Sequence, residues 1–217
     1  MTALYIFDRG DEPLPETAAE LLPPWRRERF QKLRSPAARQ ESLAAGLLWR
    51  LAMVRRGQDP AADVTVLPGG KPVLAGREEL YFSLSHSGGY ALCAVSGRPV
   101  GSDVQLRQQV NLSMLRRFHP GERAWLEALA PAEAEREFFR LWTRKEAWVK
   151  AVSREHMLSL KETDVIHELP GWFFSDYDLP GGCQAALCAG DPAAEVLFST
   201  REDRNVSCGP YLIFPPS

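Results

Sequence analysis

The residues best suited to chemistry in this chain lie in the segment Phe138–Ala151, which reads FFRLWTRKEAWVKA. Glu146 and Lys150 are four residues apart, so a helix would place them about one turn from each other on the same side. Lys145 adds a second ammonium group next to them. A carboxylate beside ammonium groups can bind a divalent cation and a phosphate, but a solvent-exposed Glu–Lys pair on an ordinary helix has the same spacing.

A second candidate carboxylate, Asp103, closes the stretch Phe82–Asp103. Two runs in this stretch, Phe82–Ser85 and Tyr90–Val95, have the pattern of short strands joined by a glycine turn. After a further break, Val100-Gly101 is expected to present Asp103 near the end of a strand. Asp103 and Glu146 would then lie on different elements and are candidates for one shared cation.

Glu146 needs a rigid helix to position it, and the apolar residues of Phe138–Ala151 supply one. Their spacing follows the i, i+3, i+4 rule for a helix with one buried face. Large aromatic side chains at helical spacing are usually part of a core. The apolar residues expected to be buried are Phe138, Leu141, Trp142, Trp148 and Val149.

Composition narrows the class of protein. The chain has 217 residues, 45% hydrophobic and 25% charged, which suits one large soluble domain or two small lobes. The net charge of −2 gives no reason to expect nucleic-acid binding. No apolar run reaches about 18 residues, and the first residues lack a signal-peptide pattern, so a cytoplasmic protein outside the membrane is expected. The four cysteines form no CxxC pair, which favours free thiols.

The rest of the chain alternates between helical and extended patterns. Ser35 is expected to cap the helix that Pro36 begins, and Gly57 is expected to end it. Pro72 removes a backbone donor, so the segment that it begins should be an edge strand or a loop. The expected helices are Trp25–Phe30, Arg39–Arg56, Arg107–Arg117 and Glu122–Ala130, and the expected further strands are Ala3–Phe7, Val64–Leu67, Trp172–Tyr177, Gln184–Ala189 and Glu195–Ser199.

A group of basic residues surrounds the first expected helix. Such a group is commonly the solvated face of a helix, and the alternative is a contact for a polyanionic ligand. The members of this group are Arg26, Arg27, Arg29, Lys32 and Arg34.

A short internal repeat suggests how the chain is divided. The tetrapeptide Ala91-Leu92-Cys93-Ala94 recurs as Ala186-Leu187-Cys188-Ala189. Each copy follows a long helix by some forty residues, after a strand and a turn with glycine. This order predicts an α+β fold of two similar lobes, residues 1–100 and 101–217, each with a long helix packed on a small antiparallel sheet.

Two segments taken together resemble the Sfp-type 4′-phosphopantetheinyl transferases. That family carries an (I/V)GxD(x)E segment and, some forty residues later, W(S/T)xKE(A/S)xxK. Here they read Val100-Gly101-Ser102-Asp103-Val104-Gln105 and Trp142-Thr143-Arg144-Lys145-Glu146-Ala147-Trp148-Val149-Lys150. Ser85-His86-Ser87-Gly88 and Gly70-Lys71-Pro72 also match, and a weaker similarity extends over most of the chain.

The resemblance implies a pseudo-twofold pair of lobes with a ligand cleft between them. It also implies Mg²⁺-dependent transfer of the phosphopantetheine arm of coenzyme A to a serine of an acyl or peptidyl carrier protein, with release of adenosine 3′,5′-bisphosphate. Asp103 and Glu146 would bind the metal, with Gln105 and Glu122 as weaker candidates.

The other matched residues receive roles from the same resemblance. Glu146 would also act as a general base, and Lys150 would stabilise or protonate the pyrophosphate oxygens. The residues expected to contact the coenzyme are Arg39, Lys71, Pro72, Ser85, His86 and Lys145.

Two departures from the family pattern leave alternatives open. Gln105 stands where many relatives have a second acid, and Ser153-Arg154-Glu155-His156-Met157 lacks the usual glycines. The alternatives are a non-catalytic homologue that binds coenzyme A or carrier, and a metal-dependent phosphoester hydrolase. A serine hydrolase is not expected, because no G-x-S-x-G segment surrounds Ser85 or Ser87. A chain with both lobes can form its own cleft, so a monomer is expected.

Overall fold

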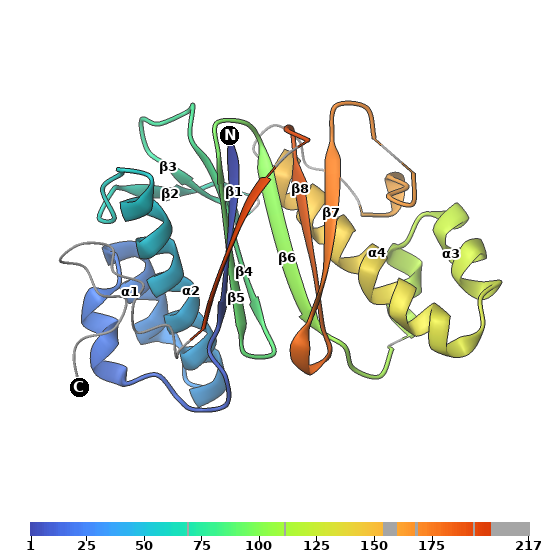
Figure 1. Cartoon of the computed structure of the whole chain (residues 1–217), viewed down its shortest axis with the longest axis horizontal. Helices are drawn as coiled ribbons and strands as arrows, with labels where there is room; N and C mark the ends of the chain where they lie inside the picture. Colours follow the sequence, from blue (N-terminus) through green and yellow to red (C-terminus); the bar gives the residue numbers. More distant parts are fainter. Residues whose placement is uncertain (69, 111, 154–159, 168, 193, 201–217) are drawn as a thin grey trace.

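An α+β fold is present in the computed structural model, which describes residues 1–68, 70–110, 112–153, 160–167, 169–192 and 194–200 (Figure 1). Two main sheets stand side by side in the middle of the molecule, with helices on the outer side of each. The α+β class expected from the sequence is therefore confirmed.

The first main sheet combines strands from both ends of the described chain. It contains β1 (Thr2–Asp8), β4 (Tyr81–Ser87), β5 (Tyr90–Ser96) and β9 (Ala194–Thr200), in the order β4-β5-β1-β9. β5 pairs antiparallel with β4 and with β1, whereas β9 pairs parallel with β1. The expectation of a purely antiparallel sheet is wrong for β9, because its pairing with β1 depends on contacts remote in sequence.

The hairpin between β4 and β5 is fixed by two glycines. Gly88 and Gly89 form the two-residue turn with φ of 59° and 87°. Two positive φ values are the signature of the turn whose twist matches paired strands. This turn sets the register in which Ser85 lies opposite Leu92.

Helix α2 (Pro36–Arg55) covers the outer face of the first sheet. Ser35 caps it as expected, because its Oγ accepts a hydrogen bond from the Ala38 amide. Leu43 and Leu47 are buried against the sheet. The smaller elements around it are η1 (Glu16–Leu21), α1 (Pro24–Lys32), β2 (Val64–Val66) and β3 (Pro72–Leu74).

The second main sheet carries the central helix. β6 (Val100–Leu106), β8 (Cys183–Ala189) and β7 (Phe173–Leu179) are antiparallel in the order β6-β8-β7. Helix α4 (Pro131–Val152) packs on β6 and β8. The two copies of the repeated tetrapeptide lie on β5 and β8, each with a neighbouring strand on both sides.

Apolar side chains fill the space between the two sheets. Leu4, Leu92, Val104 and Leu187 belong to one buried cluster drawn from both sheets. Trp142 and Trp148 of α4 are also buried, as the helical spacing predicts. The resulting order of layers is α2, first sheet, second sheet and α4 (Figure 1).

Two sequence-based boundaries need correction. Asp103 lies in the middle of β6 rather than near a strand end, because the ladder with β8 continues to Leu106. The expected helix Arg107–Arg117 is too long at its start, because residues 107–110 are not helical and the 3₁₀ helix η2 spans Leu112–Arg117. The remaining short elements are α3 (Pro120–Glu127), η3 (Leu160–Glu162) and η4 (Pro180–Gly182).

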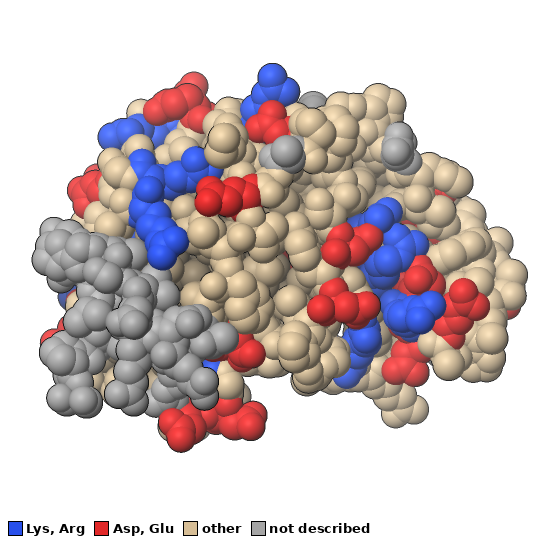
Figure 2. Space-filling model, viewed as in Figure 1, with Lys and Arg blue, Asp and Glu red and all other residues tan. Residues whose placement is uncertain are grey.

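The face shown in Figure 2 carries most of its charged side chains toward the two flanks, and the middle over the strands is mostly uncharged. Phe173 of β7 and Val196 and Phe198 of β9 are among the exposed large apolar side chains. Among the described residues, no helix combines the length and apolar character needed to cross a membrane. Cys93, Cys183 and Cys188 are buried free thiols, and Cys208 lies outside the described residues.

Candidate active site

A close approach between α4 and β6 creates the candidate site. A Cβ atom on Gly101 would lie 1.8 Å from the Ala147 carbonyl oxygen and 2.6 Å from the Ala151 amide nitrogen. Only glycine fits at this position without moving the helix backbone. The glycine of the Val100-Gly101-Ser102-Asp103 segment therefore lets the strand that carries Asp103 lie directly against the helix that carries Glu146 and Lys150.

Asp103 accepts hydrogen bonds from three side chains on different parts of the fold. Its Oδ1 accepts from Lys150 Nζ at 2.6 Å and from Ser85 Oγ at 2.8 Å. Its Oδ2 accepts from Gln105 Nε2 at 3.1 Å. Asp103 is only 3% exposed, so these donors replace water around a buried carboxylate. The structure thus brings Asp103, Lys150, Ser85 and Gln105 together.

Glu146 completes a pair of carboxylates in this region. Burial raises the pKa of Glu146 above its usual value, and the negative charge of Asp103 raises it further. Lys150 and Arg117 act in the opposite direction. The charge of Asp103 therefore acts on Glu146, which α4 carries past β6. A cation placed between them would relieve their repulsion.

Lys145 lies in a different environment from Glu146 and Lys150. Its Nζ is 2.7 Å from Glu122 Oε2, and the two side chains are 1% and 0% exposed. Lys145 also donates to the carbonyl oxygens of Leu160 and Thr163, both at 2.6 Å. An ammonium group has three donors, and these contacts use all of them. The structure therefore does not bring Lys145 to Asp103.

Glu122, expected as a weaker metal candidate, has its oxygens occupied in the same cluster. Its Oε2 accepts from the His119 amide, and its Oε1 accepts from the Val165 amide, both at 2.8 Å. His119 caps α3 in return, since its Nδ1 accepts from the Gly121 amide. Glu122 thus closes a capping box and neutralises Lys145.

Lys71 connects the β2–β3 hairpin to the end of α4. Its ammonium group contacts the carbonyl oxygen of Lys150 and lies 3.4 Å from that of Ala151. A cation at the C-terminal end of a helix is stabilised by the partial negative charge there. Pro72 follows at the start of β3, opposite Val66. The structure therefore places Lys71 against the C-terminal end of the helix that carries Glu146.

A second cluster, which we call the cationic cluster, contains Arg26, Arg29 and His86. His86 Nδ1 lies 3.2 Å from Glu41 Oε2 of α2. Burial lowers the pKa of His86, and Arg26 and Arg29 lower it as well, while Glu41 opposes this effect. The positive charges of Arg26 and Arg29 therefore disfavour protonation of His86.

Arg26 is the buried arginine of the cationic cluster. It is 3% exposed and donates to the Ser42 carbonyl oxygen at 2.8 Å. Among the described residues, Arg26 Nε is buried and has no hydrogen-bond partner. Burial lowers the pKa of Arg26 to about 10, and the charge of Arg29 contributes. This buried guanidinium therefore keeps one donor that no group of the described protein uses.

The basic group around α1 is thus divided, because Arg26 is buried whereas Arg27, Arg29, Lys32 and Arg34 are exposed. Arg39 from the next helix pairs with Glu16, with Nε and Nη2 at 2.9 and 2.8 Å from its two oxygens. Its guanidinium also lies over the ring of Phe30. A phosphate contact by Arg39 would require exchange of these partners.

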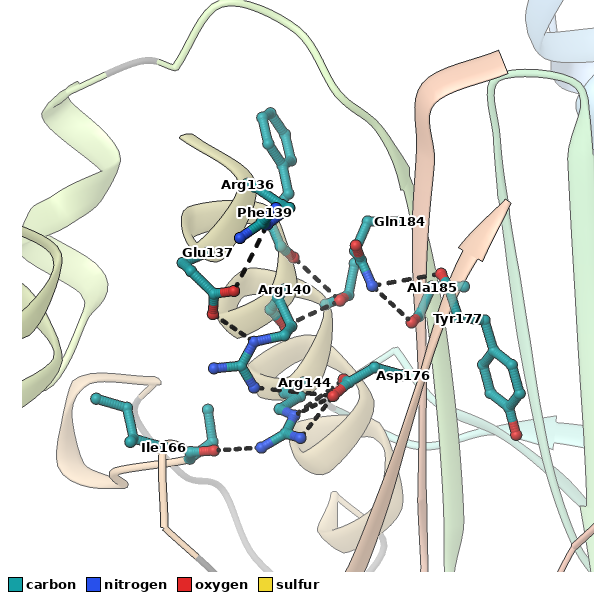
Figure 3. A network of polar contacts seen from close by, with 12 residues as sticks. Arg136, Glu137, Phe139, Arg140, Arg144, Ile166, Asp176, Tyr177, Gln184 and Ala185 are labelled. Atoms are coloured by element: carbon teal, nitrogen blue, oxygen red, sulfur yellow. Dashed lines mark hydrogen bonds and ion pairs between the residues drawn. The ribbon is translucent and has the colours of Figure 1, made fainter. Parts of the chain in front are cut away.

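An arginine network holds the outer side of α4 against β7. Figure 3 shows the guanidinium of Arg144 directed at Asp176 and that of Arg140 lying between Glu137 and Asp176. Arg144 Nε is 2.9 and 3.0 Å from the two oxygens of Asp176. Arg144 also donates to the Val165 carbonyl oxygen at 3.1 Å. These bonds fix the rotation of the helix that presents Glu146 and Lys150 to β6.

The residues present fit a hard divalent cation such as Mg²⁺. Mg²⁺ commonly binds through one or two carboxylates, with waters and substrate phosphates supplying the other oxygens. Asp103 and Glu146 provide two carboxylates, and Gln105 can offer an amide oxygen if its amide group rotates. The described residues contain no group of three or more His, Cys, Asp or Glu suited to hold a metal, so further ligands would have to come from water or substrate.

Some contributors to the site were not expected from the sequence. Glu41 pairs with His86, and the buried state of Arg26 depends on packing between α1 and α2. Ser83 and Ser87, which bond β6, are spaced by two like Ser85, and this alternation could have identified them as one strand face. The expected influence of residues 154–157 on the coenzyme entrance falls outside the described residues.

Comparison with known proteins shows which family this chain resembles. The model of the 4′-phosphopantetheinyl transferase superfamily matches residues 99–177, which include Asp103, Glu146 and Lys150. A 4′-phosphopantetheinyl transferase of Bacillus subtilis is 28% identical over 182 residues, covering 77% of this chain and 81% of that protein. The transferase Sfp of Bacillus subtilis strain 168 is 25% identical over 202 residues, covering 84% and 90%. The transferase AcpT of Escherichia coli O157:H7 is 36% identical over 137 residues, covering 61% and 66%.

The matched segment contains both candidate carboxylates, and the similarity to the two Bacillus proteins extends over most of their length. The chain therefore belongs to the 4′-phosphopantetheinyl transferase superfamily.

Proposed function

We propose that this chain transfers the 4′-phosphopantetheine arm of coenzyme A to a serine hydroxyl of an apo-acyl or apo-peptidyl carrier protein. The observation that carries the proposal is the group formed by Asp103, Lys150 and Glu146 within the segment that matches the superfamily. As a member of this superfamily, the chain is a transferase.

The reaction is a displacement at phosphorus. The carrier serine oxygen bonds to the phosphorus that bears the pantetheine arm, and the bond from this phosphorus to the bridging oxygen breaks. Adenosine 3′,5′-bisphosphate leaves with the electron pair. Charge neutralisation and alignment provide most of the catalysis in such reactions.

Asp103 and Glu146 would hold Mg²⁺ with pyrophosphate oxygens and water. When bound, this cation supplies positive charge at the reacting phosphates. Glu146 would accept the proton of the serine hydroxyl, directly or through a water. Lys150, now on Asp103, would turn its ammonium toward the leaving phosphate.

The cationic cluster would bind the 3′-phosphate of the coenzyme. Arg26 offers an unused buried donor, and His86 and Arg29 add positive charge. Ser85, next to His86, contacts Asp103, so one strand, β4, connects the nucleotide end of the site to the metal end. Lys71 and Pro72 lie near the nucleotide in this proposal, and Arg39 remains a secondary phosphate candidate.

The finer architectural predictions also belong to this proposal. The repeated tetrapeptides on β5 and β8, with α2 and α4 on the outer faces, support two lobes related by a pseudo-twofold axis. The division at residues 100 and 101, a monomeric state, a cytoplasmic location and the absence of nucleic-acid binding remain predictions.

The test incubates the protein with coenzyme A, Mg²⁺ and a panel of apo-carriers, followed by mass spectrometry of each carrier. The expected result is a mass increase equal to one phosphopantetheine group, absent from a carrier whose acceptor serine is replaced by alanine. Coenzyme binding without carrier modification by any member would contradict catalysis and favour a non-catalytic homologue. Nucleotide release without a carrier would favour a phosphoester hydrolase.

A further inference from the structure

The boundary between the two main sheets is bridged by serine hydroxyl groups. Ser83, Ser85 and Ser87 alternate along β4, and each Oγ accepts a hydrogen bond from a backbone amide of β6. The amides belong to Ser102, Val104 and Leu106, and the distances are 2.9, 3.2 and 3.0 Å. β4 and β6 belong to different sheets, so these hydroxyls satisfy amides of β6 on the side away from β8.

Ser85 differs from the two other serines in what its hydroxyl donates to. Its proton goes to Asp103 Oδ1 at 2.8 Å, whereas Ser83 Oγ lies 3.5 Å from the Ser102 carbonyl oxygen. Ser85 thus bonds both the carboxylate of Asp103 and the amide of the following residue, Val104. Two bonds to one short stretch restrict the rotation of the Asp103 side chain as well as the position of its backbone.

The hydroxyl of Ser85 has a single proton, and Asp103 uses it. Ser85 is 8% exposed and Asp103 is 3% exposed, so water competes little for this bond. A hydrogen bond to an ionised group is stronger than one between neutral groups. The proton of the Ser85 hydroxyl is therefore committed to the carboxylate of Asp103.

We propose that Ser85 is a positioning residue that holds the Asp103 carboxylate in the orientation that binds a divalent cation. This inference rests on the proposed function, because it concerns the same site. Ser85 is followed on β4 by His86, whose side chain contacts Glu41 of α2.

The test measures metal binding without turnover. Mn²⁺, whose free concentration is read by electron paramagnetic resonance, is titrated into protein saturated with coenzyme A in the absence of carrier. Ser85→Ala should weaken Mn²⁺ binding about 10- to 100-fold, the usual range for a partner of a metal ligand. The affinity of Ser85→Ala for coenzyme A, measured in EDTA, should stay within about twofold of the wild-type affinity.

Ser83→Ala and Ser87→Ala are matched controls, because each removes one acceptor for a β6 amide without removing a donor to Asp103. Both should lower the melting temperature and leave Mn²⁺ affinity unchanged. Ser85→Thr keeps the hydroxyl and should restore metal binding. If Ser85→Ala does not fold, Ser85→Cys, a weaker donor of similar size, replaces it in the same comparison.

Three results would overturn the proposal. Wild-type metal affinity in folded Ser85→Ala, with loss of coenzyme affinity in EDTA, would make Ser85 a ligand contact. An equal loss of Mn²⁺ affinity in all three alanine variants would show that the serines only hold the sheets together. A wild-type protein that binds no Mn²⁺ would also exclude a positioning role for Ser85. Failure of the proposed function gives a different result. The wild type would then modify no carrier, whether or not Ser85→Ala binds Mn²⁺ more weakly than the wild type.

Discussion

Lys145 and Glu122 form a salt bridge that water does not reach, with 2.7 Å between Nζ and Oε2 and side-chain exposures of 1% and 0%. Burial lowers the pKa of Lys145, and Glu122 counteracts this effect. The pair joins α4 to α3, and Lys145 also bonds the carbonyl oxygens of Leu160 and Thr163. This pair stabilises the surroundings of Glu146 without contacting Asp103.

The first prediction removes one partner of this pair. Glu122→Ala should destabilise the fold by about 3–5 kcal/mol, because it leaves the ammonium of Lys145 buried and unpaired. The double variant Glu122→Gln/Lys145→Met should recover a large part of this loss. Urea denaturation of the metal-free protein measures both, and a Glu122→Ala variant of wild-type stability would contradict the structural role.

The second prediction concerns Glu146 and separates stability from activity. Folding raises the pKa of Glu146. Ionisation of this group therefore lowers the stability of the fold at pH values above the folded pKa, and this cost disappears at pH values below the pKa of the unfolded chain. Glu146→Gln should therefore raise the melting temperature of the metal-free protein at pH 7. The same variant should lose more than about 100-fold in transfer rate, since it removes a proposed metal ligand.

The measurement is thermal unfolding of Glu146→Gln and wild type from pH 4 to pH 8, without and with Mg²⁺ and coenzyme A. The advantage of the variant should shrink as pH falls and should reverse when both ligands are added. Near-normal turnover of Glu146→Gln at limiting Mg²⁺ would remove Glu146 from the metal site.

The third prediction concerns Gln105, which donates to Asp103 Oδ2. Mg²⁺ needs few protein carboxylates when a pyrophosphate supplies oxygens, so Gln105→Ala should slow transfer by about tenfold or less and Asp103→Ala by far more. Gln105→Glu should tighten Mg²⁺ binding if position 105 faces the cation. A Mg²⁺ titration of the transfer rate compares the three variants, and equal inactivity of folded Gln105→Ala and Asp103→Ala would reject the two-carboxylate site.

The fourth prediction concerns the contact between β6 and α4. Gly101→Ala should destabilise the fold by about 3 kcal/mol or more, because the added Cβ meets helix backbone rather than a flexible side chain. Gly97→Ala is the matched control, since its nearest neighbour, the Glu79 carbonyl oxygen, is 3.9 Å from the added Cβ. Equal melting temperatures for the two variants would contradict the close approach.

The fifth prediction concerns the cationic cluster. A phosphate bound there should raise the lowered pKa of His86, because it supplies a negative charge close to the ring. By linkage, the affinity for adenosine 3′,5′-bisphosphate should increase as pH falls through the range between the free and bound pKa values of His86.

Calorimetric titrations from pH 5.5 to pH 8 test this prediction with the wild type and His86→Gln. Titration of the phosphate itself affects both proteins equally, so the difference between them reports on His86. Adenosine 5′-monophosphate, which lacks the 3′-phosphate, should show no such difference. Identical pH profiles for the two proteins would place the 3′-phosphate elsewhere.

The sequence predicts well those features that depend on local spacing. Helical periodicity locates α4 and the buried Trp142 and Trp148, and alternation with turn residues locates β4 and β5. The four-residue spacing of Glu146 and Lys150 indicates a shared side of the helix. These patterns are set by backbone geometry, which a short window of sequence contains.

Features that depend on contacts between distant segments could not be predicted. Lys145 and Glu146 are adjacent in sequence, but one turns toward Glu122 and the other shares an environment with Asp103. The burial of Arg26 depends on Ser42, and the parallel strand β9 depends on β1. In each case the partner is selected by how whole elements pack, which no local pattern specifies.

The pairing of β9 with β1 has a consequence for how the chain can be divided. A cut in the connection between β5 and β6 would separate residues 1–98 from residues 99–217. The first fragment would expose the edge of β1 that β9 covers, and the second would carry β9 without β1. The two fragments should therefore complement each other in trans, with β9 as the strand that reunites them, and would make this fold a split reporter for proteins fused to each half.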